Sequence, residues 1–159
     1  MNKLLYTRKA FPAVYKGIQF RSRNEARWAA YFDLLSDVYV KTGQKPLVWH
    51  YEPLDLDGWI PDFGLESANR PDILILCEVK PIHFIKAFQE LDDWKDIVRA
   101  VESLPPMERS SYLPVVCGLT PFFSWHFING WDKPVQPAIP DDDRLWRRAC
   151  NITQWRAPK

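Results

Sequence analysis

The chain has 159 residues, a length that suits one domain with one hydrophobic core. Hydrophobic residues make up 47% of it and aromatic residues 14%, which excludes an intrinsically disordered chain. The 21 Lys and Arg residues nearly balance the 20 Asp and Glu residues, so net charge does not indicate nucleic-acid binding. Any binding of that kind must come from local patches.

Cysteine usage and the absence of long apolar runs predict the cellular compartment of the protein. Cys77, Cys117 and Cys150 are widely spaced and match neither a zinc site nor a redox CxxC motif, so we expect reduced thiols. No stretch approaches the roughly 20 apolar residues of a membrane span, and the first residues contain no apolar run of the length expected for a signal peptide. We expect a cytoplasmic protein, in a bacterial or a phage-infected host cell, with no membrane partner.

The first half of the chain predicts a helix followed by a β-hairpin. Apolar residues at helical spacing predict a helix from about Ser22 to Leu35, and Leu47–Tyr51 is rich in β-forming residues. Asp57-Gly58 is a hairpin turn signal, and Trp59–Leu65 is the expected returning strand.

The second half predicts a buried strand, a long helix and a further strand. Residues 73–80 form the strongest strand of the sequence, because its first half is apolar on both faces. An apolar stripe predicts one helix from about Phe84 to Leu104, which Pro105-Pro106 ends, and Tyr112–Cys117 is a short buried strand. Beyond Thr120 we expect three weaker features: a strand or cover over 122–131, a loop over 134–140 and a short helix over 144–150.

This order of elements predicts an α/β domain with a mixed central sheet flanked by helices. Charges interrupt the apolar pattern of the sheet at one place. Glu78 and Lys80 end the buried strand, and side chains at i and i+2 of a strand point to the same face, roughly 7 Å apart. Asp62 lies on the preceding strand and can converge with Glu78 if the two strands are neighbours. The alternatives are an ion pair at a strand end for Glu78 and Lys80, and a turn residue after Pro61 for Asp62.

Two converging carboxylates favour a bound divalent cation. Oxygen ligands of this kind suit Mg²⁺ or Mn²⁺, which can polarise a phosphoryl oxygen and lower the pKa of a bound water. Lys80 beside them could position that water or neutralise developing charge. The pattern therefore favours phosphodiester hydrolysis.

Residues around the first helix carry further candidate roles. Glu25 lies on the core side of the helix, where it could be an additional ligand, but Ser22-x-x-Glu25 also fits a capping box. Arg21, Arg23 and Arg27 could meet nucleic-acid phosphates or form an ordinary solvated helix face.

Two groups outside the acidic pair are open to two interpretations each. His83 follows Lys80 closely and could line a cleft, or it could have a structural role. The tryptophans and arginines of the C-terminal segment could bind a nucleic acid or pack onto the core, with packing favoured; they are Trp146, Arg147, Arg148, Trp155 and Arg156.

Pro61-Asp62 followed by Glu78-Val79-Lys80 resembles the PD-(D/E)XK nuclease superfamily. Residues 15–28 and Trp49–Pro53 resemble the first-helix and hairpin regions of small phage and bacterial members. The resemblance implies a restriction-endonuclease-like core of order α-β-β-β-α-β over about residues 14–118, within a single domain of residues 1–159. Residues 119–159 would be a C-terminal extension.

The same resemblance implies roles for the residues of the motif. Asp62, Glu78 and the backbone carbonyl of Val79 would bind Mg²⁺ or Mn²⁺, Lys80 would assist catalysis, and Glu25 would support the site. The implied function is a metal-dependent nuclease acting on DNA. The alternative is a non-cleaving nucleic-acid-binding or regulatory module, such as a phage or mobile-element accessory protein. A homodimer or a protein partner is possible in either case.

Overall fold

A six-stranded mixed sheet forms the centre of the computed structural model, which describes residues 11–128 and 130–154. Its strand order follows the sequence, and only the central β5 and β6 run parallel. The sheet strands are β3 (Val48–Tyr51), β4 (Phe63–Glu66), β5 (Leu74–Val79), β6 (Tyr112–Cys117), β7 (Ser124–Phe127) and β8 (Pro134–Val135). A separate hairpin pairs β1 (Ala13–Tyr15) with β2 (Ile18–Phe20).

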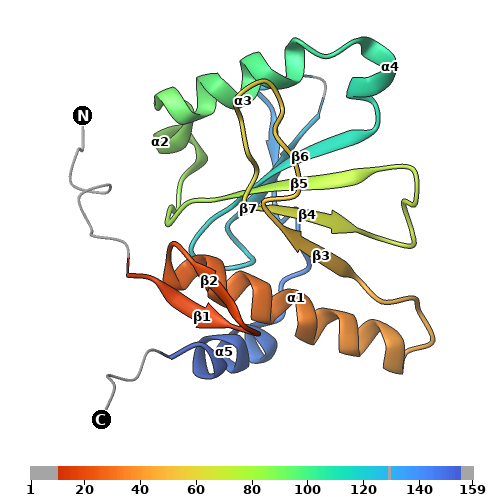
Figure 1. Cartoon of the computed structure of the whole chain (residues 1–159), viewed down its shortest axis with the longest axis vertical. Coiled ribbons are helices and arrows are strands. Elements are labelled where there is room, and N and C mark those ends of the chain that lie inside the picture. The colour runs from red at the N-terminus through yellow and green to blue at the C-terminus, as the bar shows by residue number, and fades with distance from the viewer. Residues whose placement is uncertain (1–10, 129, 155–159) are drawn as a thin grey trace.

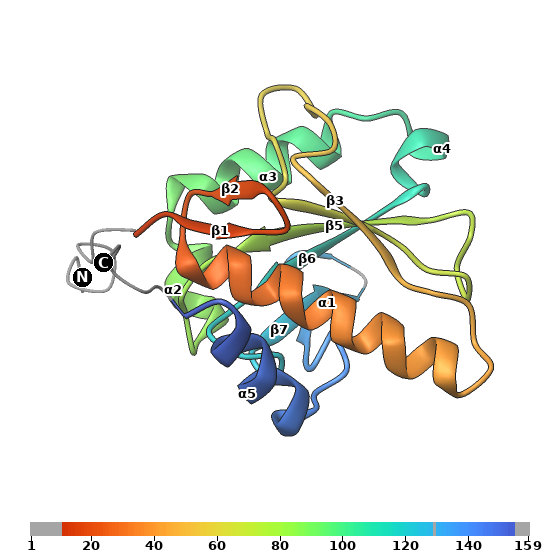
Figure 2. The same ribbon diagram turned by 60° about the horizontal axis from the view of Figure 1, so that its bottom comes forward.

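Helices cover both faces of this sheet (Figure 1). The helices are α1 (Arg23–Lys41), α2 (Ile85–Gln89), α3 (Asp92–Glu102), α4 (Pro106–Arg109) and α5 (Asp143–Ile152). α1 and α5 lie side by side on one face, as the turned view in Figure 2 also shows, and α2 and α3 lie on the other. The structure therefore confirms a mixed α/β architecture with a mixed sheet, although three helices lie between β5 and β6 where the predicted order α-β-β-β-α-β has one.

Alternate residues of β5 belong to two different hydrophobic clusters. Ile75, Cys77 and Val79 pack toward α1, whereas Leu74 and Leu76 pack toward α3. This alternation is the two-residue period of a strand that is covered on both faces. It places Glu78 and Lys80, the next residues of the Leu74 series, on the α3 side.

α1 begins with a capping box. Ser22 Oγ accepts from the Glu25 amide at 3.1 Å, and the Ser22 amide donates to Glu25 Oε2 at 3.2 Å. The helix continues to Lys41, six residues beyond the predicted end, and stops before Gly43, whose φ of 82° a β-carbon would disfavour.

The β1–β2 hairpin was not predicted from the sequence. Its two-residue turn, Lys16-Gly17, has both residues at positive φ (49° and 75°). Such turns match the twist of a hairpin, but they usually carry Asn or Asp before the glycine. Phe20, at the end of β2, is fully buried and brings the hairpin onto the Phe63 side of the sheet.

The single helix predicted over Phe84–Leu104 is wrong: α2 and α3 are separate helices. Leu91 is extended (ψ 156°) and precedes α3, whose first turn is acidic. The break allows the Phe88 and Trp94 rings to pack with their centroids 5.8 Å apart. No proline or glycine marks this break in the sequence, and Phe84, expected on the buried stripe, is 74% exposed.

The predicted strand over Trp59–Leu65 begins only at Phe63, and Asp57-Gly58 does not connect β3 to β4 directly. The β3–β4 connection closes where the Glu52 amide donates to the Asp62 carbonyl at 2.9 Å. The residues between them form a long loop, and Asp57-Gly58 turns the chain inside it, between the bridged residues Leu56 and Trp59.

The C-terminal region packs onto α1. α5 contains the predicted short helix, and Trp146 is buried against the rings of Trp28 and Tyr31. The segment predicted as a loop over 134–140 begins with the short edge strand β8. Trp155 and Arg156, also weighed as nucleic-acid contacts, lie outside the described residues. Within the described part of the chain, no helix has the length and apolarity needed to cross a membrane.

Candidate active site

Asp62 lies at the end of the sheet where the β4–β5 ladder stops. The last paired residues of these strands are Phe63 and Cys77, and beyond them Asp62 Oδ2 accepts a 2.7 Å hydrogen bond from the Val79 amide. The Asp62 side chain thus takes the place of a backbone acceptor. It is only 4% exposed, so its carboxylate is held inside the protein.

Three carboxyl groups gather around this point. Burial raises the pKa of Asp62 well above its ordinary value, and the charges of Glu78 and Glu25 raise it further. The Val79 amide opposes this shift only in part, because it stabilises the ionised form. As predicted, β4 and β5 are neighbours and Asp62 lies close enough to Glu78 for the two charges to interact.

Glu78 is held from the α3 side by a tryptophan. The Trp59 indole Nε1 donates to Glu78 Oε2 at 2.9 Å, while Glu78 Oε1 lies 3.7 Å from Lys80 Nζ. Burial raises the pKa of Glu78, and the Trp59 hydrogen bond and the Lys80 charge offset part of that rise. The two oxygens of Glu78 therefore have different neighbours.

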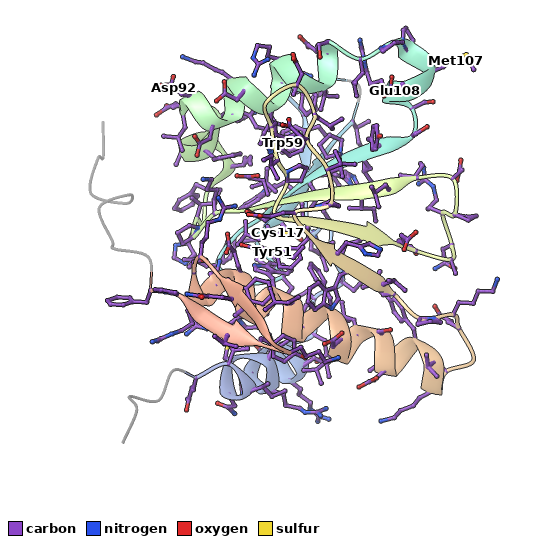
Figure 3. The ribbon with its side chains drawn as sticks, viewed as in Figure 1. Tyr51, Trp59, Asp92, Met107, Glu108 and Cys117 are labelled. Carbon is purple, nitrogen blue, oxygen red and sulfur yellow. The ribbon has the colours of Figure 1, made fainter. Side chains whose placement is uncertain are left out.

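The loop between β3 and β4 positions the Trp59 indole. Asp57-Gly58 reverses the chain so that Leu56 and Trp59 exchange backbone hydrogen bonds of 2.8 and 2.9 Å. Arg99 of α3 then fixes the turn, because its Nη1 donates to the carbonyl and the carboxylate of Asp57 at 3.1 and 2.9 Å. In Figure 3, Trp59 lies on this loop on the α3 side of the sheet, and Tyr51 lies nearer α1.

Lys80 bridges Glu78 and a second carboxylate, that of Asp93. Its Nζ lies 2.6 Å from Asp93 Oδ2, at the start of α3. Burial by itself would lower the pKa of Lys80, but the hydrogen bond to Asp93 and the charge of Glu78 outweigh burial and raise that pKa. Lys80 therefore stays charged at neutral pH.

Arg21 does not lie on a free phosphate-binding face. Its guanidinium Nη2 is 2.9 Å from Glu52 Oε1 and 3.1 Å from Asp62 Oδ1, and its Nε is 4.0 Å from Glu25 Oε1. The side chain is nevertheless 64% exposed. Arg21 is thus a counter-ion of the acidic cluster. Because its side chain is largely exposed, it can turn into solvent without disturbing the packing of the core.

Glu25 forms the predicted capping box and also lies within the acidic cluster, while its role as a ligand stays a prediction. It completes the capping box of α1, and the same Oε2 atom accepts from the Tyr51 hydroxyl at 3.3 Å. Glu25 is 6% exposed, and its charge contributes to the raised pKa of Asp62. It therefore belongs to the cluster by position, whatever its chemical role.

Arg21 precedes the N-cap residue Ser22, whereas Arg23 and Arg27 lie on α1. Each is partly exposed, and the Nε atom of each is buried without a hydrogen-bond partner among the described residues. Arg27 lies close enough to Cys150 of α5 to lower that thiol's pKa, although burial raises it overall. Phosphate binding by Arg23 and Arg27 stays a prediction.

Comparisons of this chain with models of protein families, with curated proteins and with solved structures found no match. The chemistry of the site must therefore be argued from its own residues. Two of them, Trp59 and Asp93, were not singled out from the sequence. Trp59 reaches the site from the β3–β4 loop and Asp93 from the first turn of α3. Both depend on tertiary contacts, which the periodicity of a strand does not predict.

The oxygen donors of the cluster fit a hard divalent cation in kind. Asp62 and Glu78 are carboxylates whose pKa values are raised chiefly by burial, and a cation between them would stabilise their ionised forms. Over residues 11–128 and 130–154, the described side chains include no set of three or more His, Cys, Asp or Glu already arranged around a metal position. The predicted set therefore consists of two side chains completed by the Val79 carbonyl.

Proposed function

We propose that this chain is a metal-dependent nuclease that hydrolyses phosphodiester bonds. The observation that carries the proposal is the convergence of Asp62, Glu78 and Lys80 at one end of β4 and β5. Removing carboxylates from water is costly, and packing alone gives no reason to place two of them beside each other. DNA is the proposed substrate because of the resemblance to PD-(D/E)XK nucleases.

In this proposal Asp62 and Glu78 hold Mg²⁺ or Mn²⁺, with the Val79 carbonyl as a third donor. When bound, such an ion supplies positive charge that polarises a phosphoryl oxygen and favours ionisation of water. Asp62 is oriented for this role by the Val79 amide, and Glu78 by the Trp59 indole. Arg21 must release Asp62 Oδ1, which its exposed position permits.

Lys80 is proposed to act on the substrate directly. Its ammonium group is fixed between Glu78 and Asp93, so it stays charged and holds its orientation before substrate arrives. An ammonium placed in this way can donate a hydrogen bond to a phosphoryl oxygen as negative charge develops there. Preorganised donors of this kind typically contribute about 10²–10³ to kcat.

A second candidate function rests on Arg21. Because its guanidinium already neutralises Asp62 and Glu52, the cluster is a stable ion-pair network without any metal. A module of this fold that binds nucleic acid or regulates a partner, such as a phage or mobile-element accessory protein, would need no more than this. The two functions differ in their need for a free Asp62 carboxylate.

A cleavage assay separates these functions. Purified protein is incubated with single-stranded, duplex and structured DNA and RNA in Mg²⁺, in Mn²⁺ and in EDTA. The proposal expects cleavage that requires the metal and disappears in Asp62→Asn and Lys80→Met. A folded wild-type protein that cleaves none of these substrates would overturn the nuclease proposal and favour the binding module.

A further inference from the structure

Four aromatic rings form a continuous group on the loops that follow β5 and β6. His83 contacts both Phe84 (6.4 Å between centroids) and Phe123 (5.0 Å), and Phe123 contacts Phe122 (5.1 Å). All three contacts are edge to face, with Phe84 and Phe122 as the outer rings of the group. We refer to His83, Phe84, Phe122 and Phe123 as the aromatic platform.

The outer rings of the platform are open to solvent. Phe84 is 74% exposed and Phe122 is 48% exposed, although a phenylalanine at either position gains little for folding when its ring stays in water. Two exposed phenylalanines joined through two further rings form a contiguous apolar surface, and such surfaces mark binding sites more often than isolated exposed residues do.

The platform adjoins the proposed active site through the backbone. The first of its loops starts directly after Lys80, and the second starts at Gly118, directly after β6. The two loops are bonded together, because the Leu119 amide donates to the Ile82 carbonyl at 3.1 Å. The Gly118 carbonyl also accepts from Asn24 and from Trp28, at 3.2 and 2.9 Å, and this ties the second loop to the first turns of α1.

Figure 1 shows the same arrangement: the segments that follow β5 and β6 leave the sheet on the side where α1 begins. A substrate strand whose phosphate reaches Lys80 therefore runs next to open aromatic rings. Nucleobases stack on such rings only when they are unpaired, because the faces of bases inside a duplex are already covered by their neighbours.

We infer that the aromatic platform stacks unpaired bases, so that the substrate of the site is a single strand or the frayed end of a duplex. The inference rests on the proposed nuclease function for the position of the strand, and on the exposed rings for the choice of substrate class. Stacking is tolerant of sequence because every base has an aromatic face. The near-neutral charge of the chain, +1, agrees with binding in which ring contacts outweigh phosphate contacts.

Binding without cleavage tests this inference. The fluorescence anisotropy of a labelled single strand of about 12 nucleotides is measured in EDTA, beside the same sequence as a blunt duplex. We expect the wild type to bind the single strand more tightly than the duplex. Phe84→Leu and Phe122→Leu keep an apolar side chain but lose the ring, and each should weaken single-strand binding about 5- to 150-fold.

Two further variants make the result specific to rings at this place. Phe84→Trp keeps an aromatic face and should retain wild-type binding. Met107→Ala changes an apolar residue that is 88% exposed on α4, far from the platform, and should leave binding unchanged. Equal affinity of the wild type and Phe84→Leu for the single strand would overturn the inference, as would equal affinity of the wild type for strand and duplex.

Failure of this inference can be told apart from failure of the nuclease proposal. Metal-dependent cleavage of duplex DNA that is equal in the wild type and Phe84→Leu would overturn the substrate class and leave the nuclease function intact. Ring-dependent binding of single strands in EDTA, without cleavage in Mg²⁺ or Mn²⁺, would support the platform and overturn the nuclease function.

Discussion

The backbone amide of Val79 donates a 2.7 Å hydrogen bond to the carboxylate of Asp62. This bond lies just beyond the last paired residues of β4 and β5. The Asp62 side chain therefore accepts a hydrogen bond where backbone pairing between the two strands has ended. Asp62 therefore has a structural role in addition to its proposed chemical one. Variants of this residue must be chosen so that the two roles can be separated.

Asp62→Asn and Asp62→Ala are expected to differ in stability but not in activity. The Asn carbonyl can still accept from the Val79 amide, whereas Ala leaves that buried donor unpaired, at a cost of about 1–3 kcal/mol in the free energy of unfolding. Both variants lack the carboxylate and should lose cleavage. Chemical denaturation beside the cleavage assay checks this, and equal stability of the two variants would show that the hydrogen bond contributes little.

Trp59→Phe is expected to weaken metal binding while keeping the fold. The phenyl ring retains most of the packing of a side chain that is 6% exposed, but it cannot donate to Glu78 Oε2. Loss of a group that orients a metal ligand typically costs 10- to 100-fold in metal affinity. Isothermal titration of the metal-free protein with Mn²⁺ measures this effect without relying on activity.

The matched control for that experiment is Trp49→Phe. Trp49 also donates its indole N–H to a carboxylate at 2.9 Å, but its acceptor is Asp33 of α1, outside the acidic cluster. Loss of this hydrogen bond in Trp49→Phe should leave the Mn²⁺ affinity unchanged. If both tryptophan variants weaken Mn²⁺ binding equally, the effect is one of general stability and not of Glu78 orientation.

Mg²⁺ or Mn²⁺ is expected to raise the melting temperature of the wild type. An ion that binds only the native state stabilises it by about 2.7 kcal/mol at a concentration 100 times its Kd. Asp62→Asn removes a donor and should melt at nearly the same temperature with and without the ion. Scanning calorimetry in EDTA and in Mn²⁺ tests this, and an equal shift for both proteins would place the ion at another site.

Ile97→Ala should be the more damaging of two substitutions on the α3 side. Ile97 is a residue of α3 and only 1% exposed. Truncating its side chain should therefore lower the free energy of unfolding by about 2–5 kcal/mol. Leu91 is only partly buried at the break between α2 and α3, so Leu91→Ala should cost clearly less. Urea denaturation of both variants measures the difference, and a reversed order would contradict the packing of α3.

The sequence predicted the elements whose signals are local. Residues 74–79 were found because an apolar run of this length matches a strand covered on both faces, and the two-residue period then placed Glu78 beside Lys80. The capping box of α1 could also be predicted, because it is a local sequence pattern. The meeting of Asp62 and Glu78 was predicted on the condition that their strands are neighbours, and the pairing of β4 with β5 meets that condition.

Features set by tertiary packing were not predictable in this way. The break before α3 has no proline or glycine and is explained by the packing of Phe88 on Trp94. The ion pair between Asp93 and Lys80 joins the start of a helix to the end of a strand, and no local pattern predicts it. Arg21 was read as a cation for an external phosphate, because nothing in a sequence shows that Glu52 and Asp62 lie within its reach.

The parallel pairing of β5 with β6 also bears on how the chain folds. β3, β4 and β5 form one antiparallel meander and β6, β7 and β8 form another, and the register of Leu74 with Tyr112 joins them across three helices. Closing so long a loop costs more chain entropy than closing either set of hairpins, so the joining of the meanders should limit the folding rate. Asp62 and Glu78 both belong to the first meander. The two carboxylates can therefore meet before the second half of the sheet has docked.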